Sequence, residues 1–154
     1  MLKTTREATI GLKATTHTLV YQTERSPQFI DITDRVAELV EESGIDTGIA
    51  VIFSKHTTAA IAINENEPGL IADLESMLCK MLPEADHYQH NIGHPTEDGE
   101  QPNGHAHCQH VFLGASEQIP IVAARLTFGK WQRLFLVELD QAREREVVVQ
   151  LLGQ

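Results

Sequence analysis

The densest group of reactive side chains in the sequence is NGHAHCQH, residues 103–110, in which three histidines and a cysteine fall within six positions. Imidazole binds metal ions and exchanges protons near neutral pH, so this stretch could belong to a metal site or to an acid–base site. The plain alternative is a polar surface that is rich in histidine. Because the chain has eight histidines in all, clustering alone does not decide between these interpretations.

The backbone conformation of this stretch decides which of its histidines could act together. In a helix, His105 and His107 would lie about 200° apart, whereas His107 and His110 would share a face. In an extended chain, His105 and His107 would share a face instead. Cys108 has no cationic neighbours that would favour its thiolate, so we expect an inert or partly buried thiol.

A metal site would have to draw ligands from distant parts of the chain. Zinc and similar ions need about three imidazole or carboxylate ligands, often with one open position. The sequence has no HExxH motif and no paired CxxC motifs, so the metal hypothesis rests on clustering, and a hydrated polar loop is the alternative. The histidines outside the opening stretch that come into question are His56, His87, His90 and His94.

Anion binding has a candidate in KHTT, residues 55–58, at an expected bend of the chain. Lys55 and His56 offer an amine and an imidazole, and Thr57 and Thr58 offer hydroxyls, although threonine is also an ordinary strand residue. Glu65 precedes an expected helix, where a carboxylate stabilises the helix dipole, acts as a base or orients a metal-bound histidine.

Two arginines lie in DQARERE, residues 140–146. Alternating charge at a hairpin is typical of a solvated surface, so we expect Arg143 and Arg145 to be exposed. The exception would be a guanidinium group that binds phosphate. Trp131, the only tryptophan, is expected to anchor the core or an interface.

The elements that must position these residues follow from apolar periodicity and from glycine and proline signals. Residues 34–43, the segment from Pro68 to Pro83 and residues 105–113 are expected helices, with Met77 and Met81 in the core. Residues 84–103 form an expected loop of about 20 residues, a length that is usually functional or disordered. The expected strands are 6–13, 17–21, 29–32, 47–53, 56–64, 119–126, 131–139 and 146–152.

Adjacent strands joined by short turns favour an α+β fold, with a mixed or mostly antiparallel sheet and two or three helices, in a single domain over 1–154. The 22 acidic and 12 basic residues give a net charge of −10, which shows no footprint for nucleic acid. No apolar run approaches about 18 residues, which predicts no membrane span. The two cysteines and the absence of a signal-peptide pattern favour a cytoplasmic protein.

Several segments together resemble the YjbQ family, whose members are described as secondary thiamine-phosphate synthases. The resemblance runs from about residue 15 to the C-terminus, in matching order and spacing. Its segments are KHTTAAIAINENEP (55–68), Asp73, YQHN (88–91), NGHAH (103–107), LGASEQIPI (113–121), FGKWQ (128–132) and ELDQARER (138–145).

The resemblance implies a compact α+β domain that forms homotrimers, with a histidine cluster, a divalent metal ion (zinc in the first place) and an anion near a subunit boundary. The implied metal ligands are His56, His90 and His107. Glu65 and His105 are the implied catalytic residues. The residues expected to bind the anionic substrate are Lys55, Thr57, Thr58, Asn64, Trp131 and Gln132.

The implied reaction joins a hydroxymethylpyrimidine diphosphate to a thiazole phosphate and releases pyrophosphate. A metal-dependent hydrolase and a non-catalytic trimer that binds a metal or an anion are the alternatives. The chain departs from the family pattern at Ala124, where the family has glycine, and at Lys130, where it has threonine or serine. We expect Ala124 to require an ordinary backbone conformation.

Overall fold

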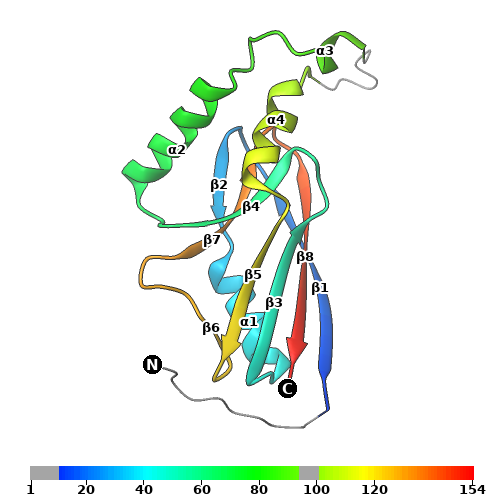
Figure 1. Ribbon diagram of the computed structural model, residues 1–154, viewed down its shortest axis with the longest axis vertical. Helices are drawn as coiled ribbons and strands as arrows, with labels where there is room; N and C mark the ends of the chain where they lie inside the picture. Colours follow the sequence, from blue (N-terminus) through cyan, green and yellow to red (C-terminus); the bar gives the residue numbers. More distant parts are fainter. Residues whose placement is uncertain (1–10, 94–100) are drawn as a thin grey trace, which may run out of the picture.

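The computed structural model describes residues 11–93 and 101–154; the first part of the expected strand 6–13 and His94 lie outside these residues. Two antiparallel sheets and four helices make up the described chain (Figure 1). In chain order the elements are β1 (Lys13–Gln22), β2 (Gln28–Asp31), α1 (Thr33–Ser43), β3 (Thr47–Ser54), β4 (Ala59–Asn64), α2 (Pro68–Met81), α3 (His90–Gly93), α4 (Gly104–Leu113), β5 (Ser116–Val122), β6 (Arg125–Leu126), β7 (Arg133–Glu138) and β8 (Glu144–Gly153).

The first sheet has the strand order β1-β8-β3-β5-β6, and the second has the order β2-β7-β4. Every strand pair among the described residues is antiparallel. The predicted α+β fold with mostly antiparallel strands is therefore confirmed. The structure also confirms the expected helices, which are 34–43, the helix that begins at Pro68, and 105–113. The expected loop 84–103 contains the short helix α3.

The three-stranded sheet is covered on both faces, which explains the continuous apolar run of β7. On one face Leu134 and Leu136 join a core with α1 and the five-stranded sheet. On the other face Phe135 and Val137 pack with Leu78 of α2 and with residues of α4 and β4. A strand buried on both faces cannot alternate apolar with polar residues.

Two of the exposed apolar surfaces of the described residues lie on α2 and on the five-stranded sheet. Met77 and Met81 of α2 are 42% and 55% exposed, so the prediction that they fill the core is wrong for the single chain. On the outer face of the five-stranded sheet, Val20, Phe53 and Val122 are also exposed. Such patches mark interaction surfaces more often than chance.

A tight turn divides the segment that was expected to be one strand over 119–126. Ala123 and Ala124 have φ angles of 51° and 56°, in the left-handed region, and the chain reverses there from β5 into β6. The expectation of an ordinary backbone at Ala124 is therefore wrong. A left-handed conformation costs a residue with a Cβ atom about 1–2 kcal/mol.

Replacing Ala124 by glycine is expected to raise the free energy of unfolding by about 1 kcal/mol, because glycine adopts this φ angle without strain. Urea denaturation measures the change. As a matched control, Ala37→Gly at an exposed position of α1 should lower the same free energy by about 1 kcal/mol. A loss of stability at both positions would refute the strain assigned to the turn.

No helix among the described residues is long and apolar enough to cross a membrane.

Candidate functional site

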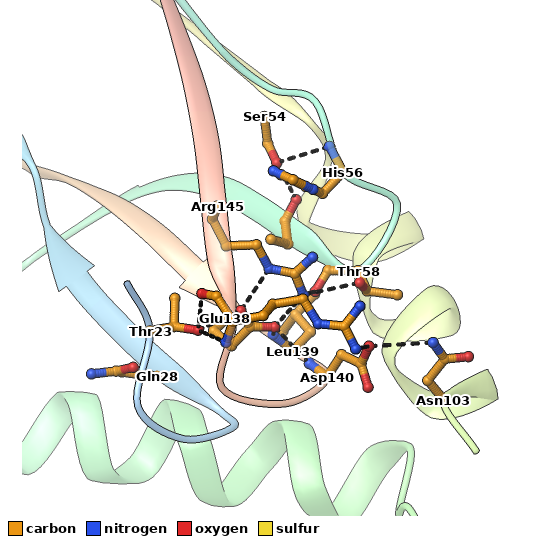
Figure 2. A network of polar contacts seen from close by, with 12 residues as sticks. Thr23, Gln28, Ser54, His56, Thr58, Asn103, Glu138, Leu139, Asp140 and Arg145 are labelled. Atoms are coloured by element: carbon orange, nitrogen blue, oxygen red, sulfur yellow. Dashed lines mark hydrogen bonds and ion pairs between the residues drawn. The ribbon is translucent and has the colours of Figure 1, made fainter. Parts of the chain in front are cut away.

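A buried ion pair joins the ends of β7 and β8 (Figure 2). Glu138 is 0% exposed and Arg145 is 2% exposed. Arg145 donates from Nε to Glu138 Oε2 over 2.6 Å and from its terminal nitrogen to Oε1. The expectation that Arg145 lies on a solvated surface is therefore wrong.

Hydrogen bonds to this ion pair connect residues at the ends of four strands, β1, β4, β7 and β8. Thr23, which follows β1, donates from Oγ1 to Glu138 Oε2 over 2.9 Å. Glu138 also accepts from the backbone N–H groups of Leu139 and Asp140. Arg145 donates to Oγ1 and to the carbonyl oxygen of Thr58, at 3.0 and 3.4 Å, just before β4. A buried pair is stable only when such additional bonds satisfy both ions.

Thr58 is thus 5% exposed and bonded to Arg145, so its hydroxyl faces the interior in a single chain. Thr57 is exposed, and Lys55 forms an ion pair with Glu146 on the surface.

His56 lies in the bend between β3 and β4 and is bonded to β8. Its Nε2 accepts a hydrogen bond of 2.8 Å from the backbone N–H of Glu146. The backbone N–H of His56 donates over 3.4 Å to Ser54 Oγ, and the Ser54 hydroxyl donates in turn to the carbonyl of Ala59. Burial lowers the pKa of His56, and the nearby charge of Arg145 lowers it further.

The segment YQHN is held against the start of α4 by close contacts. A Cβ atom at Gly104 would lie 2.5 Å from the Cβ of Tyr88, so only glycine allows this approach. Asn91 Oδ1 accepts a 2.9 Å hydrogen bond from the N–H of Gly104, and Tyr88 donates from its hydroxyl to the carbonyl of Pro83. These contacts place His90, between Tyr88 and Asn91, next to α4.

His90 and His107 lie side by side, with ring centroids 4.7 Å apart. His90 Nε2 is 3.1 Å from Asn103 Oδ1, and Asn103 Nδ2 donates to Asp140 Oδ2 over 3.3 Å. Asp140 Oδ2 also accepts from Arg143 over 2.7 Å. Because the Asp140 contact fixes the amide of Asn103, its oxygen faces His90, which therefore donates from Nε2.

The helix α4 settles how the histidines of NGHAHCQH are divided. His105 is 6% exposed, with its ring centroid 6.4 Å from that of Tyr88, whereas His107 is half-buried on the side of His90. His105 Nδ1 is buried and no described residue bonds to it. As placed, His105 offers almost no surface to a substrate.

His110, on the last turn of α4, is a source of instability. Its Nε2 is buried, no described residue bonds to it, and burial lowers the pKa of its imidazole. An unsatisfied buried polar atom costs about 1–3 kcal/mol. A histidine with a lowered pKa in the folded state gives up stability as the pH falls below its unfolded value of about 6.5, since the unfolded chain then binds more protons.

His110→Leu is therefore expected to raise the free energy of unfolding by about 1 kcal/mol at pH 7.5, and by more at pH 5.5. Urea denaturation at both pH values measures the gain. His87→Leu is the control, because His87 is exposed and its replacement removes no buried imidazole nitrogen. A gain of equal size at the two pH values would contradict the assignment.

The remaining predicted residues lie at the opposite end of β4. Asn64 pairs with Arg133 across the sheet, next to Gln132. Asn64 Oδ1 accepts from the N–H of Glu65, and Gln132 Oε1 accepts from the N–H of Gly129 over 2.7 Å. Trp131 is 60% exposed, so it anchors nothing within the chain, and Lys130 Nζ lies 4.4 Å above its ring.

Apart from the buried His105, the predicted residues form two groups in a single chain. The first group, at the start of β4, contains Lys55–Thr58, His90 and His107. The second group, at its end, contains Asn64, Glu65, Trp131 and Gln132. The six residues of β4 separate the groups by roughly 17 Å.

The predicted metal ligands do not form one ligand set in a single chain. Among residues 11–93 and 101–154, no three histidine, cysteine, aspartate or glutamate side chains are placed to hold a metal ion. His90 and His107 are close enough to share an ion, but the Nε2 lone pair of His56 is already used by Glu146. We therefore assign no chemical step to a metal in this chain.

Sequence reasoning overlooked Asn103, Asp140 and the buried pair of Glu138 and Arg145. A signal for the pair was available, since Glu138 ends a strand that is apolar on both faces. A carboxylate in such a place needs a buried cation. Asn103 and Asp140 lie in the segments NGHAH and ELDQARER, but their contact could not be predicted, because only the fold brings α4 to the turn between β7 and β8.

Comparisons with known proteins agree with this fold. The family described as "UPF0047 protein YjbQ-like" matches residues 17–154 of the chain. A UPF0047 protein of Methanothermobacter thermautotrophicus is 38% identical over 145 residues, which cover 94% of this chain and 96% of the relative. The UPF0047 protein YugU of Bacillus subtilis is 32% identical over 88% of this chain and 98% of its own length.

Among solved structures, a YbjQ-like protein of unknown function from Sulfolobus solfataricus superimposes with a TM-score of 0.87 and 38% identity. The match covers 94% of this chain and all of the other. A structure of the same family from Clostridium acetobutylicum gives a TM-score of 0.79 and 38% identity, over 88% and 98% of the two chains. The names of these relatives state no substrate.

Proposed function

Since the chain belongs to the UPF0047 family of YjbQ-like proteins, we propose that it is an enzyme that acts on a phosphorylated small molecule. The proposed reaction joins a hydroxymethylpyrimidine diphosphate to a thiazole phosphate and releases pyrophosphate. In this reaction the carbon–oxygen bond to the diphosphate breaks, and the leaving group takes the electron pair. The ring nitrogen of the thiazole supplies the electron pair for the new bond to the same carbon.

The observation that carries this proposal is the meeting of His90 and His107 at the turn between β7 and β8. Three segments that are distant in sequence supply the imidazole pair, Asn103, Asp140 and Arg143. A protein that needed only a stable fold would not require two adjacent imidazoles at its surface. Polar groups that converge from separate parts of a chain are a common feature of binding and catalytic sites.

The cationic and hydrogen-bonding side chains near this pair suit a leaving diphosphate. Lys55 and Arg143 carry positive charge, and each is held by a carboxylate, Glu146 and Asp140 respectively. Donors that are fixed before the reaction stabilise developing negative charge at little reorganisation cost. Imidazole groups can supply the proton that the leaving group takes up.

The separation of the two groups by β4 supports a homotrimer as the proposed active form. A second copy that covered the exposed sheet face or α2 would bury Phe53, Met77 and Met81. Such contacts could bring Glu65 and Asn64 of one copy to the histidines of another. A divalent ion, zinc in the first place, would supply charge neutralisation at His90 and His107, with a third ligand from outside the single chain. We also propose a cytoplasmic location, from the cysteine content of the sequence.

The proposal is tested by following both substrates with the purified protein and measuring thiamine phosphate by mass spectrometry. His90→Ala and His107→Ala are each expected to lower the turnover rate by about 100-fold or more. His87→Ala is the control, because His87 is exposed and its side chain lies within hydrogen-bonding distance of Gln89, so its loss should leave turnover unchanged. Equal effects of all three variants would overturn the proposed site.

The two alternatives predict different products in the same experiment. A metal-dependent hydrolase would release phosphate or pyrophosphate without forming thiamine phosphate. A non-catalytic binding protein would bind pyrophosphate but consume neither substrate.

A further inference from the structure

The imidazole of His56 completes the pairing of two strands. The ladder between β3 and β8 runs to the pair Ser54 and Val147. At the next position, Lys55 donates its N–H to the carbonyl of Glu146 over 3.4 Å. The N–H of Glu146 donates to Nε2 of His56 over 2.8 Å, so the ring replaces the carbonyl that the bend has turned away.

This hydrogen bond determines which nitrogen of His56 carries the proton. A backbone N–H can only donate, so Nε2 must offer its lone pair. The proton of the ring then lies on Nδ1. No described residue bonds to Nδ1, and the half-buried ring leaves it open to water or to a bound molecule.

We propose that His56 serves the site as a hydrogen-bond donor from Nδ1 and that it is not a metal ligand. The identity of the ligand, a phosphate or diphosphate, rests on the proposed function. The position of the proton rests only on the hydrogen bond from Glu146 to Nε2. A metal at Nε2 would have to displace Glu146, and a metal at Nδ1 would have to remove the proton.

A donor of fixed direction suits an oxygen atom of phosphate or diphosphate. Lys55 and Thr57 flank His56 in the chain and supply an amine and an exposed hydroxyl. Phosphate oxygens accept hydrogen bonds from all three kinds of donor. The segment KHT thus binds an anion directly rather than through a coordinated cation.

The position of the proton is tested by ¹⁵N NMR of the protein labelled at histidine, with His56→Gln to assign the resonances. We expect a protonated Nδ1 and an unprotonated Nε2 at pH 7.5, both unchanged when one equivalent of Zn²⁺ is added. A protonated Nε2, or a shift of the His56 resonances with Zn²⁺, would overturn the inference.

Inorganic pyrophosphate tests the donor role. Pyrophosphate should shift the Nδ1 resonance of His56. An unchanged spectrum would refute the role, also where the cause is that pyrophosphate does not bind. His56→Asn keeps an N–H near the position of Nδ1, and His56→Gln keeps an acceptor near that of Nε2. We expect His56→Asn to hold pyrophosphate within about threefold of the wild type and His56→Gln to lose about tenfold. The reverse order would also overturn the role.

These outcomes are separable from the fate of the proposed reaction. If pyrophosphate shifts Nδ1 but no thiamine phosphate forms, the inference stands and the reaction is wrong. If thiamine phosphate forms while Zn²⁺ binds His56, the reaction stands and the inference is wrong.

Discussion

Replacing Arg145 by methionine is expected to lower the free energy of unfolding by about 3–5 kcal/mol, because it leaves the carboxylate of Glu138 buried without its cation. Glu138 is 0% exposed and cannot turn to solvent without breaking its bond to Thr23. Urea denaturation measures the change. The hydroxyl of Thr58 would lose its donor in the same variant.

Two controls separate the buried charge from a loss of packing. Arg133→Met removes a guanidinium group that pairs with Asp31 and Asp34 near the surface, where the expected loss is about 1 kcal/mol or less. The double variant Glu138→Leu with Arg145→Met removes both charges and should recover most of the stability. A loss below about 1 kcal/mol in Arg145→Met alone would contradict the account of the pair.

Replacing Gly104 by alanine is expected to lower the free energy of unfolding by about 1–3 kcal/mol, the usual cost of forcing atoms into a filled space. The new Cβ would lie 2.5 Å from the Cβ of Tyr88 and 3.0 Å from Asn91 Oδ1. The sign is informative, since alanine is otherwise favoured over glycine in a helix by about 1 kcal/mol. Thermal and urea denaturation would measure the loss.

The same substitution should disturb the imidazole pair. Tyr88 and Asn91 flank His90, so a displaced segment would carry His90 away from His107 and lower turnover in the folded protein. Gly11→Ala is the matched control, because no described atom lies within 4 Å of the position that its Cβ would take. If Gly104→Ala is as stable and active as the wild type, the contact does not position His90.

Most of the fold could be predicted because its elements are periodic. The apolar stripe of α1 and the proline that begins α2 are local signals that the packing then uses. The turn at Ala123 and Ala124 could not be predicted from these residues, because alanine rarely adopts a left-handed conformation. The exposed methionines of α2 follow a core pattern in sequence but meet no core within the single chain.

The site was predictable only in part, because the type of a residue does not determine where its side chain points in the folded protein. The motifs indicated His90 and His107, and the structure brings them together. Hydrogen bonds in the folded chain turn Arg145 inward and engage Nε2 of His56. Local spacing does not encode the bond of His56, because Glu146 lies 90 residues away in the chain. Glu138 is only 7 residues from Arg145, but the two are buried together only once β7 and β8 have entered different sheets.

The measurement that tests the proposed function most directly is a ³¹P NMR time course of the wild-type protein with both proposed substrates. We expect pyrophosphate and thiamine phosphate to appear in equal amounts as the diphosphate disappears. Consumption of the diphosphate without thiamine phosphate, or no consumption at all, would contradict the proposal.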